Sequence, residues 1–139
     1  MYKNKLVYIE QYFLKEPKWH ASEYPLQICR SLNNDGWDVE IICGDKPYRS
    51  DVYNFSHNLS YKVNIIKSIK LNNQNLSKLI NDIYFSCKTF FLLLKIKKYN
   101  LIISQTNPPS IIFIVYLISL IKKINYVIVA MDIYPDVFF

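Results

Sequence analysis

Short apolar runs alternate along the chain with longer segments in which apolar residues recur every three or four positions. The runs cover residues 6–10, 39–43, 61–66, 101–105 and 126–131. Runs of this length that stay apolar at consecutive positions are typical of strands buried on both faces of a sheet. The sequence therefore predicts five strands, with a long polar and aromatic loop over residues 48–60 before the third.

Between these runs, the apolar spacing predicts three helices. They cover residues 22–34, 76–98 and 110–122. In the first, Tyr24, Ile28 and Leu32 share one side, Pro25 suits only a first turn, and Gly36 ends the helix. The second carries an apolar series at helical spacing, made of Ile80, Ile83, Tyr84, Cys87, Phe91 and Leu94. The alternation predicts an α/β fold, a Rossmann-like parallel sheet with helices on both faces.

Composition places this pattern in one globular domain. The chain has 139 residues, of which 51% are hydrophobic. A chain of this size and composition buries a core, which excludes the intrinsically disordered class. Residues 1–5 lead straight into a strand without the apolar stretch of a signal peptide, which favours a cytoplasmic protein.

Three cysteines and two histidines offer little chemistry. Cys29, Cys43 and Cys87 lie far apart, and together with His20 and His57 they form no metal-ligand spacing. We expect no metal site and no redox pair. All three cysteines are interpreted as small buried residues in a reducing compartment.

The net charge of +6 is distributed as lysine clusters beside apolar helical segments. These are Lys67 and Lys70, then Lys88, Lys95, Lys97 and Lys98, then Lys122 and Lys123. No nucleic-acid-binding module is recognisable. Two interpretations remain, a negatively charged membrane surface as partner or a solvated basic face. The apolar run 111–121 is too short to span a bilayer, and extending it would bury two lysines.

Asp132 directly follows the fifth predicted strand and precedes a proline turn. Ligands of open parallel sheets bind outside the carboxyl ends of the strands. Asp132 is therefore a candidate general base, and the alternative is that it caps the turn.

Four segments follow predicted strands or helices in order along the chain. They are Gln11-Tyr12-Phe13, the stretch from Leu32 through Gly36 to Ile41, Thr106-Asn107-Pro108-Pro109, and Asp132-Ile133-Tyr134-Pro135. Together they resemble the N-terminal domain of family 4 glycosyltransferases, in the bacterial group that makes cell-envelope polysaccharides. The resemblance implies the acceptor-binding half of a GT-B fold, apparently truncated, in a retaining-type enzyme. It departs from the family at Trp37, where a histidine is usual, and at Lys15, where a proline is usual.

The resemblance also implies partners and a site. A nucleotide-sugar would be the donor without a further cofactor, the acceptor would be lipid-linked or a saccharide, and the inner membrane surface would be nearby. A separately encoded C-terminal half would be needed for activity. The implied substrate-binding residues are Glu16, Lys18, Trp19, His20, Asn107 and Tyr134. The alternatives are that residues 16–20 form an ordinary surface loop and that Asn107 shapes its turn.

Two further functions stay open from the sequence. One is a non-catalytic α/β binding or interaction module, because a fold does not fix a function. The other is a small membrane-anchored protein. The first predicts binding without a complete catalytic site, and the second predicts extraction by detergent only.

Overall fold

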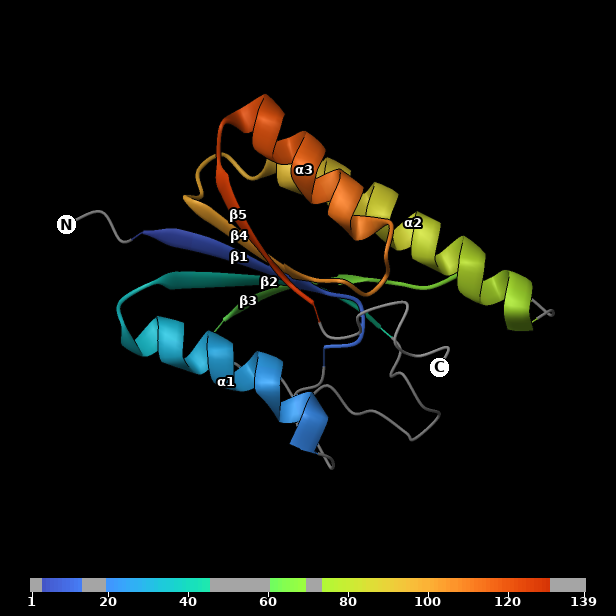
Figure 1. Ribbon diagram of the computed structural model, residues 1–139, viewed down its shortest axis with the longest axis horizontal. Coiled ribbons are helices and arrows are strands. Elements are labelled where there is room, and N and C mark those ends of the chain that lie inside the picture. The colour runs from blue at the N-terminus through green and yellow to red at the C-terminus, as the bar shows by residue number, and fades with distance from the viewer. Residues whose placement is uncertain (1–3, 14–19, 46–60, 70–73, 131–139) are drawn as a thin grey trace.

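The computed structural model describes residues 4–13, 20–45, 61–69 and 74–130, which form an α/β domain. Its elements are β1 (Lys5–Glu10), α1 (His20–Asn34), β2 (Asp38–Gly44), β3 (Lys62–Ile66), α2 (Gln74–Lys95), β4 (Leu101–Gln105), α3 (Ile111–Lys122) and β5 (Asn125–Val129). The five strands form one sheet in the order β3-β2-β1-β4-β5, and all neighbours are parallel. Helix α1 covers one face, and α2 and α3 cover the other (Figure 1). The predicted Rossmann-like fold is therefore confirmed.

The three central strands are apolar on both sides because both of their faces are covered. In β1, Val7 and Ile9 belong to the core beneath α2 and α3, whereas Leu6 and Tyr8 belong to the core beneath α1. These four side chains are almost fully buried. Alternate side chains of a strand point to opposite faces, so consecutive apolar residues are what two covered faces require.

The predicted apolar side of α1 is only partly confirmed, because Ile28 and Leu32 pack against the core whereas Tyr24 does not. The buried residues of the helix are Pro25, Leu26 and Cys29, while Tyr24 is 46% exposed. The helix begins at His20, so Pro25 lies beyond the first turn, where it removes one intrahelical hydrogen bond. The helix ends as predicted, with Gly36 at a φ of 90°, a left-handed conformation that favours glycine.

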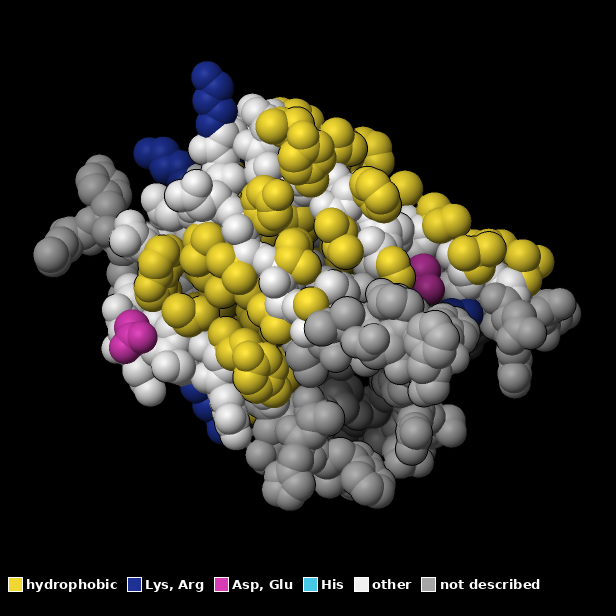
Figure 2. Space-filling view, in the orientation of Figure 1, with side chains coloured by type: hydrophobic (Ala, Val, Ile, Leu, Met, Phe, Trp, Pro, Cys, Tyr) yellow, Lys and Arg dark blue, Asp and Glu magenta, His cyan; other side chains and the backbone are white. Residues whose placement is uncertain are grey.

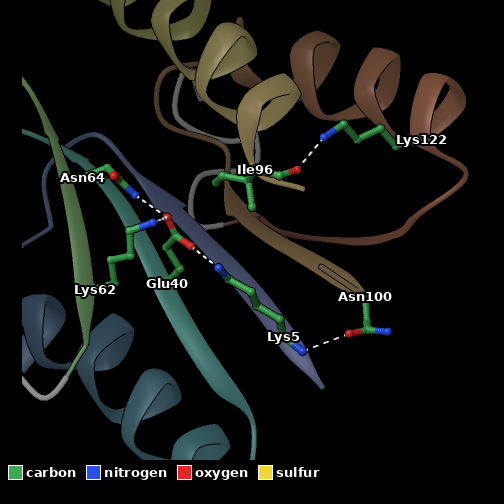
Figure 3. Close-up of polar contacts among 7 residues, drawn as sticks. All are labelled: Lys5, Glu40, Lys62, Asn64, Ile96, Asn100 and Lys122. Atoms are coloured by element: carbon green, nitrogen blue, oxygen red, sulfur yellow. Dashed lines mark hydrogen bonds and ion pairs between the residues drawn. The ribbon is translucent and has the colours of Figure 1, made fainter. Parts of the chain in front are cut away.

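Helix α2 ends at Lys95, three residues before the predicted end, and a residue of α3 caps it. The Lys122 ammonium donates hydrogen bonds to the carbonyl oxygens of Leu93 at 2.7 Å, Leu94 at 2.9 Å and Ile96 at 2.7 Å. Figure 3 shows the hydrogen bond to Ile96. The last carbonyls of a helix have no partner within it. Partial burial lowers the pKa of Lys122, whereas the three carbonyls favour its charged form. Lys122 therefore joins the two helices that cover this face.

Glu40 ties three strands together on the same face of the sheet. Its carboxylate is only 1% exposed and makes ion pairs with Lys5 of β1 and with Lys62 of β3, the latter at 3.0 Å. Asn64 of β3 also donates a hydrogen bond to it at 2.7 Å (Figure 3). Burial acts to raise the pKa of Glu40, but the hydrogen bonds from Lys5, Asn64 and Lys62 bring it below its ordinary value. This cluster is structural and lies away from the carboxyl ends of the central strands.

Candidate functional site

The strand order creates a topological switch point between β1 and β4. The chain leaves β1 toward α1 on one face of the sheet and leaves β4 toward α3 on the other (Figure 1). Ligands of doubly wound sheets bind in the crevice outside the carboxyl ends of such a strand pair. The residues that directly follow β1 and β4 are therefore the first place to look for a site.

Of the residues predicted for the site, the structure places Asn107 at this edge. It is partly buried in the loop between β4 and α3. His20 is the first residue of α1, but its side chain lies outside the described part of the chain. The others also lie outside the described residues, namely Glu16, Lys18, Trp19, Asp132 and Tyr134. The roles proposed for these six residues stay predictions.

Gln11, which directly follows β1, is held in place from two sides. Its side-chain amide donates a hydrogen bond to Asp82 of α2 at 3.0 Å, and its backbone carbonyl accepts one from the Gly44 N–H at 2.9 Å. A Cβ on Gly44 would lie 2.5 Å from that carbonyl oxygen, so the close approach requires glycine. Gln11 is only 7% exposed, and its Oε1 has no hydrogen-bond partner among the described residues.

Two further side-chain hydrogen bonds lie near the carboxyl ends of β1 and β4, one joining α2 to α3 and the other joining β4 to β1. The hydroxyls of Ser86 in α2 and Ser110 at the start of α3 lie 2.7 Å apart. On the other face, the Gln105 amide at the end of β4 donates to the Tyr8 hydroxyl at 3.0 Å. Burial, followed by the charge of Glu10, raises the pKa of Tyr8 well above its ordinary value, so this phenol stays neutral. These polar groups bond to one another and fix the strand ends relative to the helices.

Glu10, the last residue of β1, is the most perturbed carboxyl group in the described structure. Burial raises its pKa to about 8, and its Oε2 has no hydrogen-bond partner among the described residues. At neutral pH it is mostly protonated. A carboxyl with a pKa this high is a candidate proton carrier, although structural burial produces the same shift. Glu10 is not among the residues predicted for the site, although a lone acid at the end of an apolar run is the sequence signal that marks it.

The cysteines divide into two environments. Cys29 and Cys43 are buried as predicted, and burial, followed by the nearby charge of Glu10, raises the pKa of each thiol to about 12. Such thiols are unreactive at neutral pH. Cys87 is exposed on α2, so the prediction that it is buried is wrong. The reason lies in the orientation of α2.

Most of the apolar series predicted for the second helix faces solvent, although Tyr84 packs against the core and Ile80 is partly buried. The side of α2 that packs inward carries Phe85, Ser86, Thr89 and Leu93, which are almost fully buried. Ile83, Cys87, Phe91 and Leu94 lie on the opposite side and are exposed. Helical spacing alone identifies a side of a helix but does not say which side meets the sheet.

Helix α3 continues this exposed apolar surface. We call the combined surface the outer face, and it consists of Leu79, Ile83, Cys87, Phe91 and Leu94 of α2 with Phe113, Tyr116, Leu117, Leu120 and Ile121 of α3. Phe113 is 72% exposed and Phe91 is 59% exposed. Figure 2 shows hydrophobic side chains along both helices and onward over the β5 side of the sheet. The outer face is the largest feature of the described structure that core packing does not explain.

The basic residues accompany the outer face. Residues 74–130 contain seven lysines and one aspartate, a net charge of +6, which equals the net charge of the whole chain. Six of these lysines are exposed, namely Lys78, Lys88, Lys95, Lys97, Lys98 and Lys123. The single aspartate, Asp82, is hydrogen-bonded to Gln11. The part of the chain that bears the apolar surface is therefore also the part that attracts anions.

Within the described ranges, no three or more His, Cys, Asp or Glu side chains gather in a way that could hold a metal ion. No helix in the described part of the chain combines the length and the apolar composition needed to cross a bilayer.

Comparison with known proteins supports the fold and nothing more specific. No family model and no curated protein matches the sequence. Among solved structures, the chain is similar to the C-terminal domain of a hydrogenase from Pyrococcus furiosus, with 15% sequence identity, a TM-score of 0.58 and 92% of each chain covered. At that identity the likeness establishes a common α/β architecture.

The predicted membership of the family 4 glycosyltransferases is wrong. No glycosyltransferase model matches the chain, and the structural likeness leads to a hydrogenase domain instead. The segments behind the resemblance include Gln11 after β1, Gly36 after α1 and Asn107 after β4. Turns at these three positions are expected in any sheet of this topology, so their order reflects the fold rather than a family. The donor and acceptor implied by the resemblance lose that support, whereas the role of Asp132 is inferred from its position after the fifth predicted strand and stays a prediction.

Proposed function

We propose that this domain is a non-catalytic interaction module that binds its partner through the outer face of α2 and α3. The observation that carries the proposal is the exposure of large apolar side chains over two adjacent helices. Phe91, Phe113 and Tyr116 alone expose on the order of 300 Å². With the leucines and isoleucines beside them, the patch exceeds what monomeric proteins ordinarily leave in water.

The packing of the two helices supports a stable rather than an incidental surface. Their inward sides are fixed by Leu93, Val115 and Ile118, which are fully buried in the core. Lys122 links α3 to the C-terminal end of α2, and the Ser86–Ser110 pair joins the middle of α2 to the start of α3. A partner would therefore meet a preformed surface, which keeps the ordering cost of binding low.

The polar edge at the switch point supports a binding role less strongly. Gln11, Asp82, Ser86 and Ser110 are engaged with one another. These hydrogen bonds link β1 to α2 and α2 to α3, which accounts for the four side chains structurally. We therefore assign no catalytic role to these residues.

A photo-crosslinking experiment tests the proposal without assuming a partner. p-Benzoylphenylalanine would replace Phe113 on the outer face or, as a matched control, Tyr24, an exposed aromatic residue of α1 on the opposite side of the sheet. After irradiation of cells that produce the protein, we expect several-fold more adduct from position 113, with a defined mass. Equal yields from the two positions, or no adduct at position 113, would contradict an interaction role for the outer face.

A further inference from the structure

We propose that the partner of the outer face is the surface of a membrane that contains anionic lipids. This inference rests on the proposed function, because it names the partner of the same face. It is carried by the coincidence of two independent features, an exposed apolar surface and the entire net positive charge of the chain.

The arrangement of lysines around the apolar surface suits a lipid interface. Lys88 and Lys95 lie on α2 beside the exposed stripe, and Lys97 and Lys98 follow its end. The Lys88 ammonium lies 5.5 Å from the centre of the Tyr84 ring, so the charge lies against an aromatic side chain, and Lys88 is exposed. Lysines in this position reach lipid phosphates while neighbouring apolar side chains enter the headgroup region.

The apolar side chains are of the kind found at the membrane interface. Phe91, Phe113 and Tyr116 are aromatic, and leucine and isoleucine fill the space between them. Aromatic and leucine side chains on one side with lysines around them are typical of surface-bound helices. Helix α2 packs against the sheet along its inward side, through Phe85 and Leu93, so it would lie along the membrane surface rather than cross it.

Charge disfavours a second copy of the chain as the partner. Two copies docked through this face would bring two segments of net charge +6 together, with Asp82 as the one acid in residues 74–130 of each. Asp82 is already hydrogen-bonded to Gln11. Like charges at this density oppose self-association, whereas an anionic surface is attracted.

Vesicle sedimentation tests the lipid proposal. The probes are vesicles of phosphatidylcholine alone and vesicles in which about a third of the lipid is phosphatidylglycerol, since anionic headgroups attract each nearby lysine. We expect binding to the mixed vesicles to be at least about 25-fold stronger, since two lysines near the surface already give that factor at about five-fold per charge. Sodium chloride at about 0.5 M shortens the screening length to about 4 Å and should release much of the bound protein.

Matched variants separate the contribution of the lysines from that of the apolar side chains of the outer face. Lys88→Gln with Lys95→Gln should weaken binding about 25-fold, at about five-fold per charge. Phe113→Gln with Leu120→Gln should weaken it about ten-fold or more. The controls, Arg30→Gln and Tyr24→Gln on α1, should leave binding unchanged. All of these positions are exposed, and circular dichroism would verify that each variant is folded.

The outcomes distinguish the lipid proposal from the function on which it rests. Equal binding to both vesicle types, or no binding to either, would overturn an anionic membrane as partner. If position 113 then still gives a protein adduct or a dimer, the interaction module stands and its partner is a protein. If position 113 gives no adduct and no vesicles are bound, both proposals fail.

Discussion

Replacing Glu10 with glutamine is expected to raise the free energy of unfolding by about 3 kcal/mol at pH 7. The pKa of this carboxyl is about 8 in the folded domain, against an ordinary value of 4.5. Between these two values the unfolded chain releases the proton while the folded domain retains it. Stability therefore falls as pH rises, by up to about 1.4 kcal/mol per pH unit, and the loss is complete above pH 8. Glutamine has nearly the shape of the neutral acid and cannot ionise.

The measurement is urea denaturation of the wild type and of Glu10→Gln at several pH values between 4 and 9. The difference in unfolding free energy should be small at pH 4 and should grow steadily up to pH 8. Parallel stability curves would mean that Glu10 titrates normally in the fold. That result would remove Glu10 as an unusual group at the switch point.

Replacing Glu40 with glutamine is expected to have the opposite effect, a loss of about 2 kcal/mol at pH 7. The charge of Glu40 is buried and is compensated by Lys5 and Lys62, and glutamine keeps only the hydrogen bond to Asn64. Because the pKa of Glu40 is lowered in the fold, its contribution is present above the ordinary pKa. That contribution is lost as pH falls through the folded value.

Thermal or urea unfolding at pH 7 and at pH 3 checks this prediction, and the variant should approach the wild type at the lower pH. Lys62→Gln is the control, because the Lys62 side chain is 67% exposed and an exposed partner contributes under about 1 kcal/mol. If Glu40→Gln costs no more than Lys62→Gln, the cluster in Figure 3 does not stabilise the sheet as described.

Much of the fold could be predicted because burial on two faces leaves a local signal. Residues 101–105 were expected as a strand and form β4 with the same bounds. Residues 39–43 fall within β2, and Gly36 ends α1 because the chain needs a positive φ there. Strand positions and helix ends depend on a few residues that are neighbours in the chain, so they can be predicted from a single sequence.

Features that depend on distant residues could not be predicted in the same way. The series that includes Cys87 and Phe91 was correctly placed on a helix, but which side of that helix meets the sheet depends on β4 and α3. The sequence places Lys122 in a basic cluster, whereas in the structure Lys122 caps α2, which ends 27 residues earlier in the chain. The perturbed pKa of Glu10 likewise arises from burial that only the assembled fold provides.

Spin labelling at Cys87 tests the central claim most directly. Cys87 lies between Ile83 and Phe91 on the outer face, while Cys29 and Cys43 are buried, so a thiol-specific nitroxide should react selectively. On addition of anionic vesicles, we predict that the label becomes more accessible to oxygen and less accessible to a water-soluble nickel chelate. A label at Arg30→Cys in a Cys87→Ser background should not change. Unchanged accessibility at Cys87 under conditions in which the protein sediments with the vesicles would show that another surface makes the contact.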